Sequence, residues 1–179
     1  MDLLSMITKQ LSDPKVLAQL GKSAGTQPKQ AQQVTENALP MLLSALQKNA
    51  KTPEGAQSLD KAIEQHKDDQ IGDLQKFFQN VDTNDGAKIL QHIFSNKNEA
   101  VQANLAQKTG LQQNQVSGLM TQLAPLVLGM LGNQKKAQGA QGDVMILLGS
   151  VMGMMGNQQG SQAGTAGVVG SLLKKFLKK

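Results

Sequence analysis

The amino-acid sequence predicts an all-α protein built around an internally duplicated helical domain. The chain has four Phe, no Trp, no Tyr and nine Met, so its core must be built from Leu, Ile, Val, Ala and Met, a mixture that favours helices over strands. Apolar residues recur at helical spacing along most of the chain. Residues 105–131 also repeat the pattern of residues 20–46, 85 positions earlier, and such a repeat determines the architecture.

The two copies share their turn-forming and helix-bending residues. Gly25 aligns with Gly110, and Pro40 aligns with Pro125. The other identities pair Leu20 with Leu105, Gln27 with Gln112, Gln30 with Gln115, Leu43 with Leu128, and Leu46 with Leu131. Each copy therefore predicts a short helix ending at a glycine, a tight turn, and a long apolar helix that its proline bends or breaks. A glycine turn between two such helices is also the pattern of a helix-turn-helix unit.

The first half of the chain carries clear helix start and stop signals. Pro14 and Pro28 fit the first turn of a helix, and Thr52 is followed by a proline and an acid, as at a capped helix start. In order, we expect helices over residues 3–11, from residue 14 to the glycines at 21–25, from residue 28 to residue 46, and from residue 53 to residue 66.

The second half is less regular. Apolar residues at 71–78 predict a helix, and residues 82–86 (DTNDG) predict a turn before a helix that ends at Phe94. Asn96 and Glu99 resemble a capping box that opens the helix leading into the second copy. Beyond it we expect a flexible connection over residues 132–143 and one apolar helix over residues 144–156. The domain therefore covers about residues 1–156, and residues 157–179 form a flexible Gly/Gln linker and a short basic amphipathic helix.

Composition and charge argue against several classes of protein. The absence of cysteine removes disulfides, thiolate catalysis and cysteine-based zinc sites, and it fits a reducing compartment. The first residues lack the basic start of a secretory signal, and no stretch approaches the roughly 20 apolar residues that span a bilayer, so we expect a cytoplasmic protein. All 18 basic residues are lysine, and four lie among the last six positions, which leaves a net charge of +1 elsewhere. The body therefore has no excess of positive charge for binding nucleic acid.

Three blocks of the second half resemble a known family. They are residues 85–94 (DGAKILQHIF), 109–111 (TGL) and 123–131 (LAPLVLGML), and residues 52–66 of the first half also fit. They are similar to the YidB-like bacterial family of domains of unknown function, over roughly residues 20–131. The resemblance implies a bacterial, all-α, cytoplasmic protein with no established activity, and it supplies no catalytic residues. Ser95 departs from the pattern, because the family usually has Gly after Phe94, so a different turn is expected there.

The second copy carries polar residues where a helix-turn-helix protein would read DNA. Gln112, Gln113, Asn114 and Gln115 open its second helix and are able to hydrogen-bond adenine edges. Phosphate contacts usually supply much of the affinity for DNA, yet residues 112–122 contain no Lys, and the chain contains no Arg. A helical pair that serves structure or protein binding is therefore favoured, and DNA binding is the alternative.

The two histidines are the remaining candidates for chemistry. Asp68 and Asp69 near His66 raise a metal or acid–base site, but His66 and His92 without cysteine make a thin ligand set, so packed or capping roles are favoured. The acids of residues 82–86 lack the spacing of a calcium loop, and a turn with a helix cap is favoured there. The sequence shows no phosphate-binding loop, nucleophile elbow or dinucleotide fingerprint. We expect neither enzyme activity nor a cofactor or metal.

Two further segments are candidates for binding. The apolar helix over residues 144–156 combines Gly149 and Gly153 with four methionines, which suits close approach of a partner, although packing on the domain is favoured. In the tail, apolar residues lie on one side and lysines on the other, a pattern typical of contact with an anionic membrane or an acidic partner. Because so short a helix is marginal in water, a disordered solubilising end is the alternative. The tail candidates are Leu172, Leu173, Lys174, Lys175, Phe176, Leu177, Lys178 and Lys179.

These observations predict a non-enzymatic helical module for protein interaction or scaffolding, with an unidentified protein as its partner. Nucleic-acid binding through the helix-turn-helix-like units is the first alternative. Weak association of the tail with an anionic membrane is the second, and it is compatible with either function.

Overall fold

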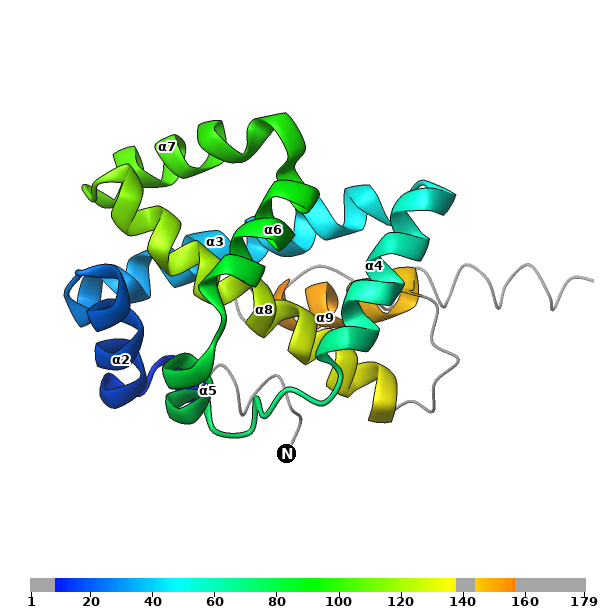
Figure 1. The fold of residues 1–179 in the computed structure, drawn as a ribbon, viewed down its shortest axis with the longest axis horizontal. Coiled ribbons are helices and arrows are strands. Elements are labelled where there is room, and N and C mark those ends of the chain that lie inside the picture. The colour runs from blue at the N-terminus through cyan, green and yellow to red at the C-terminus, as the bar shows by residue number, and fades with distance from the viewer. Residues whose placement is uncertain (1–8, 138–143, 157–179) are drawn as a thin grey trace, which may run out of the picture.

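The computed structural model describes residues 9–137 and 144–156, and the regular elements in these ranges are all helices. They are α2 (Pro14–Ala24), α3 (Pro28–Asn49), α4 (Pro53–His66), α5 (Leu74–Asn80), α6 (Thr83–Phe94), the short 3₁₀ helix η1 (Ser95–Lys97), α7 (Asn98–Thr109), α8 (Gln113–Ala137) and α9 (Val144–Gly156) (Figure 1). The all-α prediction is confirmed. Most of the helix expected at residues 3–11, and all of residues 157–179, lie outside the described ranges.

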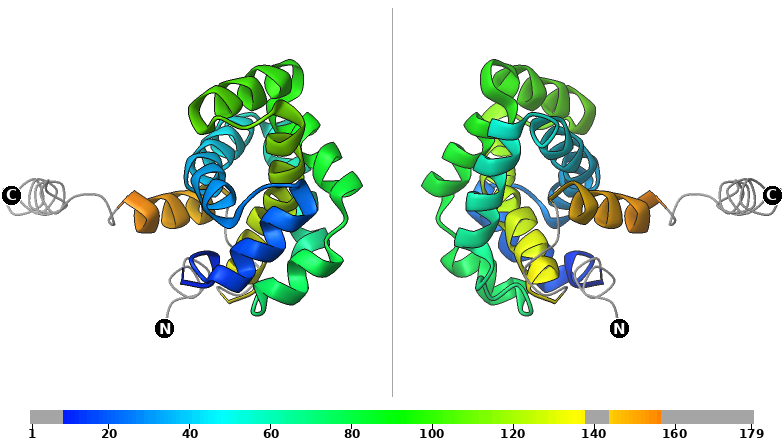
Figure 2. Two further views of the ribbon diagram at one scale, coloured as in Figure 1. Left: turned by 90° about the vertical axis from the view of Figure 1, so that its left-hand side faces the viewer. Right: turned by 90° about the vertical axis from the view of Figure 1, so that its right-hand side faces the viewer.

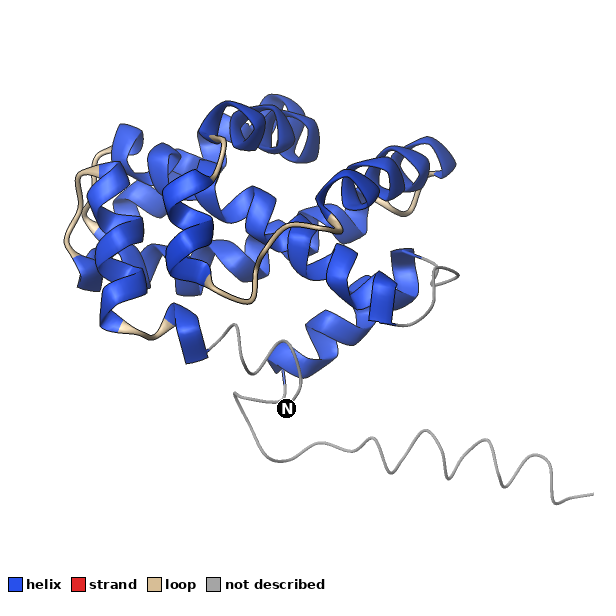
Figure 3. Ribbon diagram, turned by 60° about the horizontal axis from the view of Figure 1, so that its bottom comes forward, coloured by secondary structure: helices blue, strands red, loops and turns tan. Residues whose placement is uncertain are grey.

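Helix α8 is the centre of the fold. It runs diagonally through the molecule in Figure 1 and contacts α2, α3, α4, α6, α7 and α9. Figure 3 colours the described residues by secondary structure and shows helices joined by loops. Every residue from Leu119 to Gly132 is buried, because neighbours cover all its sides. Contrary to the expectation that no stretch comes close to the length and apolarity of a membrane span, α8 meets both criteria among the described helices, but 78% of its apolar window is buried inside the protein.

Two glycines allow neighbouring helices to touch α8 through their backbones. A Cβ atom on Gly86 of α6 would lie 1.8 Å from the carbonyl oxygen of Thr121. A Cβ atom on Gly132 of α8 would lie 2.6 Å from the Cα atom of Lys67, just after α4. Because neither position has room for a side chain, α6 and α4 cross α8 at shorter range than helices with larger contact residues do.

The two helix–turn–helix segments end and begin in the same way. Gly25 after α2 and Gly110 after α7 adopt left-handed conformations, with φ of 67° and 69°. The next helix opens with a backbone N–H that donates to a glutamine three residues on, Gln27 to Gln30 and Gln112 to Gln115, at 3.1 Å in both. The long helices contain Pro40 and Pro125 but continue past them to Asn49 and Ala137, so neither proline breaks its helix.

Three local expectations need correction. The Asp82 carboxylate accepts the N–H of Asn84 at 2.8 Å, so α6 begins at Thr83, inside the segment expected to be a turn. α7 has no side-chain cap, because Asn96 lies in η1 rather than at the helix start. α8 continues to Ala137, so residues 132–137 are helical instead of a flexible connection.

Ser95 occupies a strained turn. Among the residues described, it is the one non-glycine residue with positive φ, at 49° with ψ of −126°. This backbone conformation disfavours residues that have a Cβ atom. The turn after Phe94 therefore suits glycine, and serine adopts it at a cost of about 1–3 kcal/mol.

Candidate functional site

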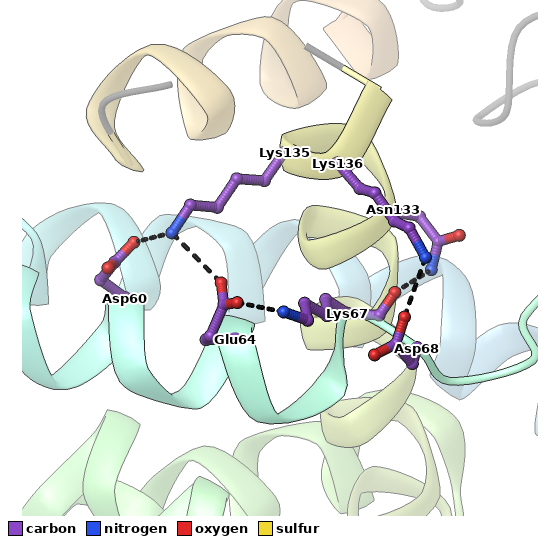
Figure 4. A network of polar contacts seen from close by, with 7 residues as sticks. All are labelled: Asp60, Glu64, Lys67, Asp68, Asn133, Lys135 and Lys136. Atoms are coloured by element: carbon purple, nitrogen blue, oxygen red, sulfur yellow. Dashed lines mark hydrogen bonds and ion pairs between the residues drawn. The ribbon is translucent and has the colours of Figure 1, made fainter. Parts of the chain in front are cut away.

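A polar network joins the C-terminal parts of α4 and α8 (Figure 4). Lys135 of α8, whose side chain is 12% exposed, donates to Asp60 at 2.5 Å and lies 3.6 Å from Glu64. Glu64 in turn pairs with Lys67. The hydrogen bond to Asp60 raises the pKa of Lys135, and the hydrogen bond from Lys67 lowers the pKa of Glu64. These carboxylates face lysines of the same chain, which indicates a structural role.

The segment after α4 is held against α8 by further contacts. Lys136 donates to Asp68 at 2.9 Å, and this hydrogen bond lowers the pKa of that carboxyl group. The Asn133 amide donates to the Lys67 carbonyl at 3.4 Å (Figure 4) and to the Gly129 carbonyl at 3.0 Å. Since exposed ion pairs contribute little to stability, the buried apolar contacts and the Asn133 bonds position this segment.

His66 lies between two carboxylates. Its Nδ1 atom is 2.8 Å from Asp69 Oδ2, and its Nε2 atom is 3.2 Å from Asp85 Oδ2 of α6. The ring borders a pocket of about 520 Å³ between α4, α5 and α6. A carboxylate faces each ring nitrogen, and both carboxylates line the same pocket. The other imidazole, His92, is exposed on α6.

No group of three or more His, Cys, Asp or Glu side chains in the described ranges is arranged to hold a metal ion. The carboxylates around His66 instead tie the end of α4 to the start of α6. These two contacts support a packing role for His66.

Two polar side chains at the start of α8, those of Asn114 and Gln115, make hydrogen bonds within the fold. The Gln115 side chain accepts the Gln112 N–H at 3.1 Å and donates to the Gly25 carbonyl at 2.7 Å. The Asn114 side chain accepts the Gln115 N–H at 2.9 Å. Gln112, Gln113 and Asn114 are exposed, but Gln115 has both ends of its amide engaged. Three of the four DNA-reading candidates are therefore accessible, and the fourth links the two turns.

Helix α9 has one buried face and one exposed apolar face. Val144, Leu147 and Leu148 are buried against the domain. Met145 is 36% exposed and Ile146 is 62% exposed, and they are the large apolar side chains that are exposed among the residues described. Gly149 and Gly153 are exposed on the same side of the helix. We call Met145, Ile146, Gly149 and Gly153 the outer face of α9.

Sequence reasoning found this helix but not its outer face. The sequence favoured packing of α9 on the domain, and this is true of its buried face alone. The sequence also pointed to the glycines and methionines of α9 rather than to Ile146. A usable signal was the lack of any charged residue in α9, whereas a helix with one side in water usually carries charges there. The tail candidates Leu172 to Lys179 lie outside the described residues.

The fold is that of a small all-α protein. Its central helix, α8, is buried by shorter helices, and one of these, α9, has an exposed apolar face. The chain belongs to a family described as bacterial protein of unknown function (DUF937), whose model matches residues 5–134. This membership confirms the expected resemblance. No curated protein and no solved structure matches the chain. The matched range ends within α8, so α9 lies beyond it.

Proposed function

We propose that this protein is a non-enzymatic helical module for protein interaction or scaffolding in the cytoplasm, and that the outer face of α9 binds its partner. The observation that carries the proposal is the exposure of Met145 and Ile146 on a helix without charged residues. Exposed apolar patches are typical of interaction surfaces, and methionine adapts to different partners. An uncharged surface of this kind suits an apolar helix of another protein better than a polar ligand.

We also infer that the domain arose by internal duplication, and that α9 corresponds to α4. The matching glycine turns and glutamine caps support the duplication. α4 contacts α8, the long helix of the second copy, and α9 contacts α3, the long helix of the first. Val144 and Leu148 lie 85 positions after Leu59 and Ile63, and all four side chains are buried.

The duplication identifies what is unusual about α9. Lys61 and Glu64 are exposed on α4, and the corresponding positions of α9 are Ile146 and Gly149. Charged residues therefore occupy this face in the first copy, and apolar or small residues occupy it in the second. An exposed apolar face promotes association, so its presence at a position where the fold accepts charges supports a binding role.

Nucleic-acid binding by helix-turn-helix-like units is the alternative, and it has less support. Gln115 is committed to hydrogen bonds within the fold, and the first turn of α8 has no basic residue to contact phosphate. Membrane contact through residues 168–179 is compatible with either function, because the tail is separate from the domain body in sequence.

An affinity capture with matched variants tests the proposed function. The bait is the chain ending at Gly160, in three forms: the parent, Ile146→Asp on the outer face of α9, and Gln57→Asp on the exposed side of α4. Both changes add one negative charge at an exposed position, so both variants should keep their helical fold. We expect the parent and the Gln57→Asp variant to capture a bacterial protein that the Ile146→Asp variant does not capture. An identical set of retained proteins in all three would overturn the proposal.

A further inference from the structure

We propose that the basic tail, residues 168–179, folds back onto the outer face of α9 and covers it. This inference rests on the proposed function, because it names an occupant within the same chain for the proposed binding surface. Such a contact would make the tail an internal competitor of the partner protein.

The outer face of α9 has room for a second helix at close range. A Cβ atom on Gly149 or Gly153 would meet no atom within 4 Å, so packing inside the described structure does not require glycine at either position. Each glycine costs a helix about 1 kcal/mol relative to alanine. α9 also projects from the body, with its C-terminal end directed away from the other helices (Figure 2). Another helix can therefore lie against it and approach its backbone at the glycines.

The lengths of the segments fit this arrangement. α9 has 13 residues and is about 20 Å long. Residues 168–179 would form a helix of about 18 Å. Residues 157–167 connect the two and span up to about 35 Å when extended. The tail is thus able to turn back and run antiparallel along the whole of α9.

The side chains of the tail also suit this surface. Its apolar residues fall on one side of a helix, namely Val168, Val169, Leu172, Leu173, Phe176 and Leu177. With that side on the uncharged α9, most of the lysines remain in water. α4 contacts α9 and carries Asp60 and Glu64, but these carboxylates already pair with Lys135 and Lys67, so apolar contact is what favours docking of the tail.

The linker of residues 157–167 makes α9 a better docking surface for the tail than a second copy of the chain or a separate molecule. A helix of about a dozen residues is marginal in water, so the tail needs an apolar surface on which to fold. A short linker presents α9 to the tail at an effective concentration of about 1 mM, far above the concentration of most cellular partners. If the tail is docked about 90% of the time, the apparent affinity of a partner for α9 falls about tenfold.

Hydrogen exchange of the α9 amides tests the contact in the full chain. We expect exchange about tenfold slower in the full chain than in the chain ending at Gly160, in the absence of any partner or lipid. The double variant Leu172→Asp with Phe176→Asp should exchange as fast as the shortened chain. Ser171→Asp is the matched control, because position 171 lies on the lysine side of the tail helix, and it should keep the slow exchange.

Three results would overturn this inference. The first is equal exchange of α9 in the full and shortened chains. The second is protection that increases with protein concentration, which would assign the surface to a second copy. The third is protection that requires anionic vesicles, which would assign the tail to a membrane. None of these would refute the proposed function, which stands if the chain ending at Gly160 retains a partner that depends on Ile146.

Discussion

Replacing Gly86 by alanine tests the crossing of α6 over α8. A Cβ atom there would lie 1.8 Å from the Thr121 carbonyl oxygen, whereas ordinary contact begins at 3.4 Å, so the two backbones must separate by about 1.6 Å. Overpacking of this kind costs about 1–3 kcal/mol, and replacing glycine by alanine within a helix returns about 1 kcal/mol. Because backbone meets backbone, no side-chain rotation relieves the clash. The overpacking cost therefore lies at the upper end of its range, about 3 kcal/mol, and after the helix gain Gly86→Ala should lower the free energy of unfolding by about 2 kcal/mol.

Urea denaturation followed by circular dichroism measures this loss. With an m-value of about 2 kcal/mol/M, the midpoint should fall by about 1 M. Gly149→Ala is the matched control, because its Cβ atom would meet nothing within 4 Å, and its midpoint should stay the same or rise. Equal midpoints for the two variants would refute the close crossing of α6 over α8.

Three further predictions follow from local geometry. Ser95→Gly should raise the free energy of unfolding by about 1 kcal/mol or more, because glycine adopts the positive φ without strain, and a lower urea midpoint would contradict this. The free energy of unfolding should also depend on pH. The lowered pKa values of Glu64 and Asp68 contribute stability that is present above their unfolded-state pKa values and is lost as pH falls through the folded-state values. The raised pKa of Lys135 contributes stability that is present below its unfolded-state pKa and is lost as pH rises through the folded-state value. Thermal denaturation should therefore give a lower melting temperature at both the acidic and the basic end of the pH range. Gln115→Ala should lower the free energy of unfolding by about 1 kcal/mol, because it removes two hydrogen bonds. Neither this variant nor the parent should bind duplex DNA at about 0.15 M salt. A sequence-specific gel shift by the parent would favour the nucleic-acid alternative.

The sequence predicted the helix boundaries best where the determining chemistry is local. Pro14 and Pro28 occupy first turns as expected, and the Thr52 side chain caps α4 by accepting the Gly55 N–H at 3.1 Å. The resemblance noted in the sequence implied Gly where this chain has Ser95, and the positive φ there explains why glycine suits that turn. A cap or a left-handed turn depends on a few neighbouring residues, so its signal is present in the sequence.

Prediction was wrong where tertiary contacts decide the structure. Residues 82–86 contain strong turn formers, yet Gly86 serves a helix crossing because α8 packs against it. Residues 132–137 were expected to be flexible because of their glycine and polar residues. They remain helical because Gly132 packs against α4 and Lys135 pairs with Asp60 there. Single-sequence reasoning cannot find such partners, because Thr121 lies 35 positions after Gly86 and Asp60 lies 75 positions before Lys135.

The candidate binding surface could be predicted only in part, because it too depends on tertiary contacts. The sequence shows that α9 is apolar throughout, but not which of its sides the domain covers. The structure buries Leu147 and Leu148 and exposes Met145 and Ile146, and this division depends on how α9 packs on α3 and α8.

Site-specific photo-crosslinking in bacterial cells tests the central claim most directly. A photoreactive amino acid replaces Ile146 on the outer face of α9 or, as the matched control, Lys61 at the corresponding position of α4, in the chain ending at Gly160. We predict a light-dependent adduct heavier than the chain itself for position 146 and none for position 61. Adducts of the same kind at both positions, or at neither, would contradict the assignment of this surface to protein binding.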